Sequence, residues 1–217
     1  MRRFDLAVGF IDWHTAVVAS GAEVRARRPD AAARTALQHV ERIVSDYLVT
    51  SAGGSRFRVR LRLYTGWHEG TTRTPRFQGI TKVKRTYASQ VRTYRGGRVA
   101  FLGGDDGVQF GARLAYASPG RLLQKHAVHL LDTLRDRDGK PTEKMVDTAL
   151  VVDLLGLAHR NEAQRYVVVS DDDDMLPGVF AAEAAGASVG MLSQPGKRSR
   201  FMSHAADLIS TYGSVGA

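Results

Sequence analysis

Two short apolar runs constrain the fold most, and each of them ends directly in aspartate. Leu6–Ile11 is followed by Asp12, and Tyr166–Val169 is followed by Ser170 and the four successive aspartates 171–174. A nearly continuous apolar run of this kind is typical of a parallel strand that is buried on both faces. The two runs therefore predict a sheet covered by helices, with carboxylates at the ends of its strands.

The remaining apolar patterns alternate between strand and helix. After Pro29, apolar residues recur at steps of three and four until Gly53 and Gly54, which predicts a first crossover helix that Asp30 caps. Further expected elements are a long helix from Lys144 to Ala158, a helix over Leu176–Ala185, a strand over Ser188–Leu192 and a closing helix over Phe201–Tyr212; His126–Leu134 fits a strand or a short helix. This order predicts an α/β fold, a three-layer α/β/α doubly wound (Rossmann-like) arrangement around a parallel sheet.

One predicted strand has an unusual arginine face. Phe57, Val59, Leu61 and Leu63 alternate with Arg56, Arg58, Arg60 and Arg62. Alternation with period two predicts a strand that is only half buried. Such a strand fits an exposed edge or a seam between subunits, which leaves a homo-oligomer open.

The stretch from Gly70 to Gly104 is strongly basic and contains no Asp or Glu. Its glycine pairs punctuate short β-like pieces, so we expect β-hairpins over Thr81–Tyr116, inserted into the core at about residues 70–120. One interpretation is a nucleic-acid clamp; the other is an exposed β elaboration that is basic only because the whole chain is. The candidate nucleic-acid-binding residues are Lys82, Lys84, Arg85, Arg92, Arg95, Arg98 and, further along, Lys144.

Composition limits the class of protein. The chain has 217 residues, a formal net charge of +9 and no cysteine. This length suits one domain over residues 1–217, and the charge favours a polyanionic partner, with nucleic acid as the obvious one. The absence of cysteine excludes disulfides and thiolate metal sites, and no apolar run reaches transmembrane length. We therefore expect a soluble cytoplasmic protein with no membrane partner.

The aspartates at the strand ends predict a metal centre. In open parallel sheets, ligands bind outside the carboxyl ends of the strands, where Asp12 and the cluster 171–174 both fall. Asp147 stands at the start of the long helix and can reach the same crevice. Carboxylates so gathered favour a hard divalent cation, Mg²⁺ or Mn²⁺, that promotes phosphodiester hydrolysis. The alternative for residues 171–174 is a solvated acidic loop.

Several segments resemble one family. VGFID ending at Asp12, KMVDTALVVD over Lys144–Asp153, VVVSDDDDMLPGV followed by GASVGML, and SHAADLI are similar to the NYN family of PIN-like ribonucleases. The resemblance covers both ends of the chain and omits much of Gly66–Gly120. It implies a PIN-like fold and Asp12, Asp147, Asp172 and Asp174 as the catalytic, metal-binding residues, with Ser170 aligned on the family's serine.

The chain departs from the family pattern at two places. Thr15 stands where the family has asparagine after the first strand. In the acidic loop Asp171 replaces a glycine, Asp173 a small residue and Met175 an aromatic residue. Candidates for supporting roles around the metal are Thr15, Asp153, Ser170 and Asp171. His14 fits either a proton-transfer role or an ion pair with the acidic cluster, and Lys144 either a phosphate contact or a solvated helix start.

Together these features predict a nuclease. The favoured function is a metal-dependent endoribonuclease that hydrolyses RNA, with single-stranded DNA as an open substrate alternative. A catalytically inactive nucleic-acid-binding or scaffold protein with the same fold is the second hypothesis. A phosphatase or a topoisomerase-primase-like domain is the third, although no second Asp follows Asp12 at two residues and the next Glu is Glu23.

Overall fold

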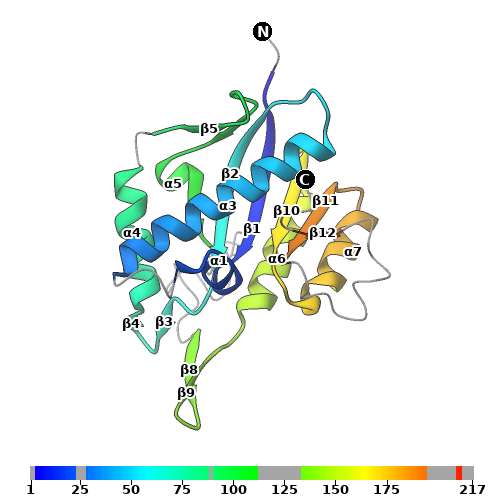
Figure 1. Cartoon of the computed structure of the whole chain (residues 1–217). Helices are drawn as coiled ribbons and strands as arrows, with labels where there is room; N and C mark the ends of the chain where they lie inside the picture. Colours follow the sequence, from blue (N-terminus) through cyan, green and yellow to red (C-terminus); the bar gives the residue numbers. More distant parts are fainter. Residues whose placement is uncertain (1–2, 23–27, 88–89, 112–132, 195–208, 212–217) are drawn as a thin grey trace.

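The computed structural model describes residues 3–22, 28–87, 90–111, 133–194 and 209–211. Its centre is a mainly parallel sheet flanked by helices (Figure 1). The strands of this sheet are β1 (Asp5–Asp12), β2 (Phe57–Tyr64), β5 (Arg92–Tyr94), β6 (Val99–Phe101), β7 (Val108–Phe110), β10 (Arg165–Val169), β11 (Val189–Ser193) and β12 (Ile209–Thr211). The helices are α1 (Trp13–Ala19), α3 (Pro29–Ser51), α4 (Pro75–Thr86), α5 (Gly104–Gly107), α6 (Val146–His159) and α7 (Leu176–Ala184).

The strand order places the two aspartate-ended strands side by side. Along the described sheet the order is β12-β11-β10-β1-β2-β6-β5, and β7 also pairs with β2. β1 lies between β10 and β2 and is parallel to both. The carboxyl ends of β10, β1 and β2 therefore share one edge of the sheet, as expected for a doubly wound α/β fold.

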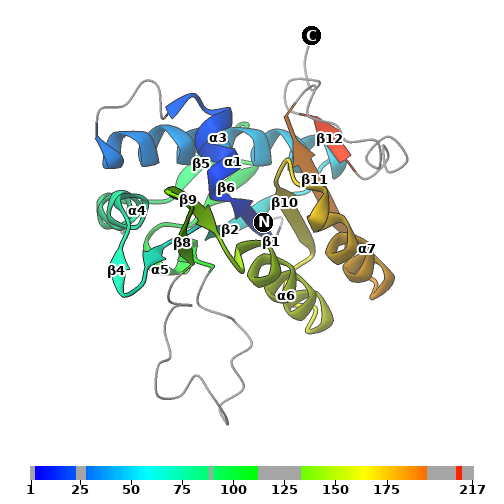
Figure 2. The ribbon, with the colours of Figure 1, turned by 90° about the horizontal axis from the view of Figure 1, so that it is seen from below.

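Helices cover both faces of the sheet, which confirms the predicted three-layer architecture. Figure 2 shows α1 and α3 on one side of the strands and α6 and α7 on the other. The alternation of side chains along β1 explains the two layers, because Ala7 and Ile11 pack in one apolar cluster while Val8 and Phe10 pack in the other. The sequence of β1 is a continuous apolar run because both faces of this strand are buried.

Sequence signals account for the ends of the helices next to the site. Asp12 is the N-cap of α1, and its side chain accepts a hydrogen bond from the Thr15 backbone N–H. Helix α3 begins at Pro29, where a proline is tolerated because the N–H it lacks has no partner inside a helix. Its N-cap is Arg28, and Asp30, which the sequence predicted as the cap, lies in the first turn.

The prediction of hairpins over the basic region is wrong for much of that region. Pro75–Thr86 form helix α4, and β7 pairs with β2 in parallel rather than in a hairpin. The helix forms because the Thr74 side chain caps it and its apolar residues Phe77, Ile80 and Val83 pack against the core. A hairpin is present at β5 and β6, which pair antiparallel. Residues 88–89 and 112–116 of the predicted stretch lie outside the described residues.

Two short antiparallel hairpins lie outside the main sheet. β3 (His68–Glu69) pairs with β4 (Thr72–Arg73), and β8 (Leu134–Arg137) pairs with β9 (Lys140–Glu143). The second hairpin matches the polar turn predicted over Arg135–Pro141. It projects from the carboxyl edge of the sheet, directly before α6 (Figure 1).

At the C-terminal end, Ile209–Thr211 form strand β12 beside β11, where the sequence predicted the last turns of a helix. β-branched residues at Ile209 and Thr211 favour the strand. The rest of that predicted helix, residues 201–208 and 212, and the segment 126–132 lie outside the described residues. The predictions for α6, α7, β10 and β11 are confirmed within a few residues at each end.

The arginine-faced strand is not an edge of the sheet. β2 lies inside the sheet, between β1 and the strands β6 and β7. Arg58 and Arg60 are exposed, but the Arg62 guanidinium is buried and donates to Asp153 on α6 at 2.6 Å and to the Tyr64 hydroxyl at 3.1 Å. The Asp153 carboxylate compensates the charge of Arg62, and the sequence of the strand itself gives no sign of this partner.

Candidate metal centre

The first candidate ligand and the acidic loop leave the sheet at the same level. Ile11 pairs with Val169 across β1 and β10, so the next residues, Asp12 and Ser170, are neighbours at the carboxyl edge. The Ser170 Oγ donates to Asp12 Oδ2 at 3.1 Å. The topology of the sheet therefore joins two segments that are 158 residues apart in the chain.

Asp12 is held by a set of three hydrogen bonds. Besides the bond from Ser170, its carboxylate accepts from the Thr15 backbone N–H at 3.2 Å and from the Thr15 Oγ1 at 2.6 Å. Burial raises the pKa of Asp12, the bonds from Thr15 and Ser170 oppose that rise, and the charge of Glu143 adds to it. Thr15, which replaces the family's asparagine, thus fixes the orientation of Asp12 at the end of β1.

Ser170 also orients the acidic loop. It is fully buried, and while its hydroxyl donates to Asp12, its oxygen accepts from the Asp172 backbone N–H at 3.1 Å. The Asp172 Oδ1 in turn accepts from the Asp174 backbone N–H at 3.0 Å, at the start of the short 3₁₀ helix Asp173–Met175. One buried hydroxyl therefore connects Asp12 to the segment that carries Asp172 and Asp174.

Asp147 completes the group. It lies in the first turn of α6, where a negative charge interacts favourably with the helix dipole. Its pKa is raised from 3.8 to about 6, first by burial and then by the charges of Asp172, Asp12, Glu143 and Asp174. The three other predicted ligands, and in addition Glu143, therefore lie within electrostatic reach of Asp147.

The group is anionic and built from oxygen donors, which is the chemistry that Mg²⁺ and Mn²⁺ prefer. In the described part of the chain no three Asp, Glu or His side chains are already drawn together at metal-binding distance. Mutual repulsion of the carboxylates opposes a closer approach until a cation neutralises them. The Asp173 Oδ1, in the same loop, is buried and accepts no hydrogen bond from the described residues. In their chemistry these side chains suit a hard divalent cation, while in the described residues they do not stand at ligand distance from one another.

Two of the candidates for supporting roles serve other contacts. Asp171 accepts from the backbone and the side-chain nitrogens of Gln194, both at 2.7 Å, and so ties the acidic loop to the end of β11. Asp153 is fully buried and binds Arg62 and the Tyr64 hydroxyl, the latter at 2.8 Å. Asp153 therefore fixes α6 against β2, which in turn sets the position of Asp147 at the start of that helix.

Sequence reasoning missed a second polar cluster beside the carboxylates. Glu143, the last residue of β9, accepts from the Arg76 Nη1 at 3.0 Å, from the Gly66 backbone N–H at 3.1 Å and from the Thr65 hydroxyl. The Arg76 Nη2 lies 2.9 Å from the His14 Nδ1. His14 thus contacts an arginine rather than the acidic cluster. Glu143 stands four residues before Asp147, a spacing that could have marked it as a neighbour.

A cavity of about 630 Å³ lies next to this cluster. Its walls come from the residues after Asp12, the start of α4 and the β8–β9 hairpin: His14, Gly66, Thr74, Pro75, Arg76, Leu134, Pro141, Thr142 and Glu143. This volume is in the range of small-molecule and cofactor sites. Because Glu143 belongs to the cavity and also acts on Asp12 and Asp147, the cavity opens beside the carboxylates.

The predicted clamp arginines lie elsewhere. Arg92 binds the buried Glu41 of α3, Arg95 binds Asp46 of the same helix, and Arg98 donates to the carbonyl oxygens of Ser55 and Ala52. Arg98 is also at the amino end of β2, since its carbonyl accepts from Phe57. That end is roughly 23 Å from Tyr64 at ~3.3 Å per residue. These three arginines hold the β5–β6 hairpin to α3 and are not brought to the carboxylates.

The other basic candidates are divided between α4 and the start of α6. Lys82 pairs with Asp30 at 3.0 Å and Lys84 with Asp105 at 2.6 Å. Arg85 and Lys144 are exposed. Lys144 lies between Glu143 and Asp147, so of the predicted basic residues it is the one next to the carboxylates in sequence.

Comparison with known protein families gives one result. The model of the NYN domain matches residues 113–212. This part of the chain is similar to the NYN family. The matched segment holds Asp147, Asp172 and Asp174, and the sheet adds Asp12 from the preceding part of the chain. The similarity supports a nuclease of the PIN-like type and, with it, a nucleic-acid substrate.

The other comparisons add no relative. The chain has no significant match among the curated proteins or among the solved structures. Among the described helices, none combines the length and the apolar composition that crossing a membrane requires.

Proposed function

We propose that this protein is a metal-dependent endoribonuclease that hydrolyses phosphodiester bonds of RNA. Asp12, Asp147, Asp172 and Asp174 are the proposed ligands of Mg²⁺ or Mn²⁺. One observation carries the proposal: burial and the charges of Asp172, Asp12, Glu143 and Asp174 raise the pKa of Asp147 to about 6 at the carboxyl edge of the sheet. Such a concentration of uncompensated negative charge is costly unless the protein uses it to bind a cation.

The chain's own side chains define how such a site is organised. Thr15 and Ser170 fix Asp12, and the Asp172 backbone N–H bonded to Ser170 sets the distance between the two ligand-bearing segments. The buried Arg62–Asp153 pair sets the position of α6 and hence of Asp147. A bound divalent cation supplies an activated water and stabilises the charge that develops on the phosphoryl group.

The adjoining cavity suits the nucleotide next to the scissile bond. Arg76 lies at its wall, and the Arg76 side chain is 29% exposed, so it can reach a phosphate while Glu143 and His14 orient its guanidinium. Lys144 lies exposed at the same edge. These cations counter the charge of a polyanion beside a negative metal site, and we infer that RNA enters along this edge in the cytoplasm.

A cleavage assay tests the proposal. Labelled single-stranded RNA and DNA are incubated with the protein and Mg²⁺ or Mn²⁺, beside an Asp172→Asn/Asp174→Asn variant. A matched control, Asp106→Asn/Asp138→Asn, makes the same chemical change at two exposed carboxylates outside the group. We expect metal-dependent cutting of RNA by the wild type and the control, and none by the Asp172/Asp174 variant.

The alternative function is nucleic-acid binding without turnover. Its main support in the sequence was the asparagine replaced by Thr15, but Thr15 makes two hydrogen bonds to Asp12. Binding of RNA with no cleavage under either metal would favour this alternative. Equal cutting by the wild type and the Asp172/Asp174 variant would refute the proposed ligands.

A further inference from the structure

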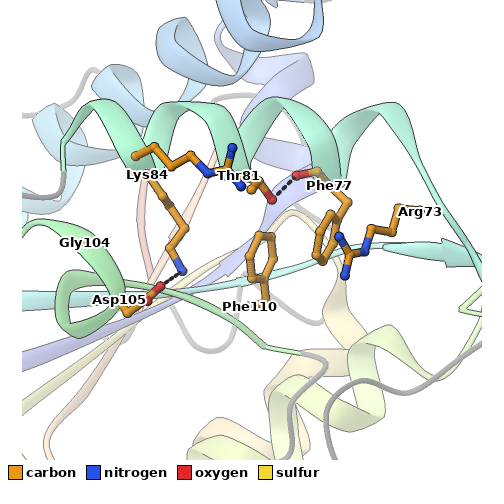
Figure 3. A pocket seen from close by; sticks show the side chains of 8 residues that line it. Arg73, Phe77, Thr81, Lys84, Gly104, Asp105 and Phe110 are labelled. Atoms are coloured by element: carbon orange, nitrogen blue, oxygen red, sulfur yellow. Dashed lines mark hydrogen bonds and ion pairs between the residues drawn. The ribbon is translucent and has the colours of Figure 1, made fainter.

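A second pocket, on the far side of α4 from α3, combines aromatic rings with cations. It has a volume of about 370 Å³ and is lined by Arg73, Phe77, Thr81, Lys84, Arg85, Gly104, Asp105 and Phe110. Figure 3 shows the Phe77, Lys84 and Phe110 side chains between helix α4 and the segment that carries Gly104, Asp105 and Phe110. No family motif and none of the proposed metal ligands belongs to this pocket.

The aromatic part of the pocket is a preformed stack. The Phe77 and Phe110 rings are 4.5 Å apart and nearly parallel, with an interplanar angle of 11°. The Arg73 guanidinium lies 4.9 Å from the centre of the Phe77 ring, and the Lys84 Nζ lies 4.8 Å from the centre of the Phe110 ring. The stack is thus closed by a cation at each end (Figure 3). Cation-π contacts hold both charged groups in place.

Positive charge predominates in this pocket. Three of its lining residues are basic, and one, Asp105, is acidic. Lys84 is only 11% exposed and pairs with Asp105, whose side chain is 96% exposed. Arg73 and Arg85 are exposed and make no ion pair with an acidic residue in the described part of the chain. The pocket therefore offers two arginines, and a lysine with an easily displaced partner, to an anion.

The pocket lies on the same edge of the sheet as the metal centre. Phe110 pairs with Leu63, and Leu63 pairs with Ile11, the residue before Asp12. Two strand spacings of ~4.8 Å place Phe110 roughly 10 Å from Ile11. That distance is within the reach of a few nucleotides, since each step already rises ~3.4 Å in a stacked duplex and an unstacked single strand extends further. A single strand whose scissile phosphate lies at Asp12 can therefore reach the pocket.

We propose that this pocket binds a nucleotide of a single-stranded nucleic acid, a few positions away from the bond that is cut. Lys84 and Arg85 contact one phosphate of the strand and Arg73 contacts another, and a base stacks on the outer face of the Arg73 guanidinium, which extends the Arg73–Phe77–Phe110 stack. Arginine planes and aromatic rings are common platforms for unpaired bases. This inference rests on the proposed function, since it concerns the substrate of the same site.

Binding of a fluorescent single-stranded RNA, measured by anisotropy in EDTA at several salt concentrations, tests the pocket without cleavage. We expect Arg73→Ala/Arg85→Ala to weaken binding by about tenfold or more and to flatten the salt dependence by about 1.4 in log Kd per log salt, because two phosphate contacts are lost. Arg58→Ala/Arg60→Ala is the matched control. It removes two exposed arginines from β2 and is expected to leave both values unchanged.

A second variant gives an effect in the opposite direction. Asp105→Asn removes the one acidic side chain of the pocket and frees Lys84, so we expect tighter binding of RNA and a steeper salt dependence. Because Asp105 is almost fully exposed, the change is expected to leave the fold intact. A misfolded variant would not bind RNA more tightly, so a gain in affinity by Asp105→Asn cannot be explained by a loss of folded protein.

Three results would overturn the inference. The first is that the wild type does not bind RNA, and the second is that Arg73→Ala/Arg85→Ala binds RNA as the wild type does. The third is that Arg73→Ala/Arg85→Ala loses as much affinity for a poly-glutamate peptide as for RNA, which would mean that the pocket recognises charge alone. Failure of the proposed function is separate: a wild type that binds RNA through the pocket but cuts nothing with either metal contradicts the nuclease and not the pocket.

Discussion

Replacing Asp147 with Asn is expected to stabilise the metal-free protein near neutral pH. Burial and the surrounding carboxylates raise the pKa of Asp147 from 3.8 to about 6. The folded protein therefore holds this proton more tightly than the unfolded chain, and the stability that this provides is present below pH 3.8 and lost as the pH rises to about 6. Above pH 6, the ionised Asp147 is a net cost to folding.

The size of that cost follows from the shift. About two pKa units correspond to an upper limit of ~3 kcal/mol at 1.36 kcal/mol per unit. Solvent screening of the partly exposed side chain, and the favourable interaction with the α6 dipole that Asn loses, reduce the expected gain to about 1 kcal/mol. For a chain of this size that gain is a rise of about 2–4 °C in the melting temperature.

Thermal unfolding followed by circular dichroism in EDTA measures the effect. Asp147→Asn is compared with the wild type between pH 4 and pH 7.5, and Asp106→Asn, at an exposed carboxylate outside the group, is the control. We expect the advantage of Asp147→Asn to grow with pH, and saturating Mn²⁺ to stabilise the wild type more than the variant. A variant that melts below the wild type at pH 7.5, or a difference that does not change with pH, would refute the reasoning.

Three further changes test the supporting structure. Ser170→Ala removes the hydroxyl between Asp12 and Asp172 and should lower RNA cleavage by about 10–100-fold, as loss of a group that orients a metal ligand does; full activity in a turnover assay would contradict this positioning role. Asp153→Asn leaves Arg62 without its buried carboxylate and should lower the free energy of unfolding in urea by about 3–5 kcal/mol. The double variant Arg62→Met/Asp153→Leu should recover much of this loss. If Asp153→Asn is as stable as the wild type, the ion pair contributes little to stability. Gly79→Ala would place a Cβ 2.5 Å from the Pro29 carbonyl oxygen and should lower stability by about 1–3 kcal/mol, because it forces α4 away from α3. Gly53→Ala is the control, since Gly53 has open space around it and the change should leave stability unaltered. Equal melting temperatures of the two variants would argue against the close contact of α4 with α3.

The sequence predicted the centre of the fold because local patterns there agree with the tertiary structure. β1 and β10 are continuous apolar runs, and their burial on both faces in the middle of the sheet is the reason for that pattern. Asp12 and the loop after Val169 meet because parallel neighbouring strands end at one edge. Asp147 could be predicted to lie beside them because the apolar pattern of α6 shows where this helix begins, and Asp147 is in its first turn.

The basic region was predicted less well, because its many basic residues made helix α4 hard to recognise and because the acidic partners of its arginines lie far away in the sequence. α4 carries Lys82, Lys84 and Arg85 beside its apolar stripe, and the capping pair Thr74–Pro75 was the signal that could have identified it. The partners of the arginines are distant in the chain, as Arg92 with Glu41 shows, so no local pattern could reveal them. Composition alone therefore could not show that Arg92, Arg95 and Arg98 contact α3 and the residues after it.

The contacts around the cavity were also beyond sequence reasoning. Arg76 and Glu143 are 67 residues apart, and they meet only because the β8–β9 hairpin folds beside the start of α4. Glu143 has no motif of its own. Its role emerges from its effect on the pKa values of Asp12 and Asp147.

The most direct measurement is an anomalous diffraction map of crystals grown with Mn²⁺. The account predicts a manganese peak at the carboxyl edge of the sheet, coordinated by carboxylate oxygens of Asp12 and of at least two of Asp147, Asp172 and Asp174. A peak bound elsewhere, or no peak at this edge at a Mn²⁺ concentration that supports RNA cleavage, would contradict it.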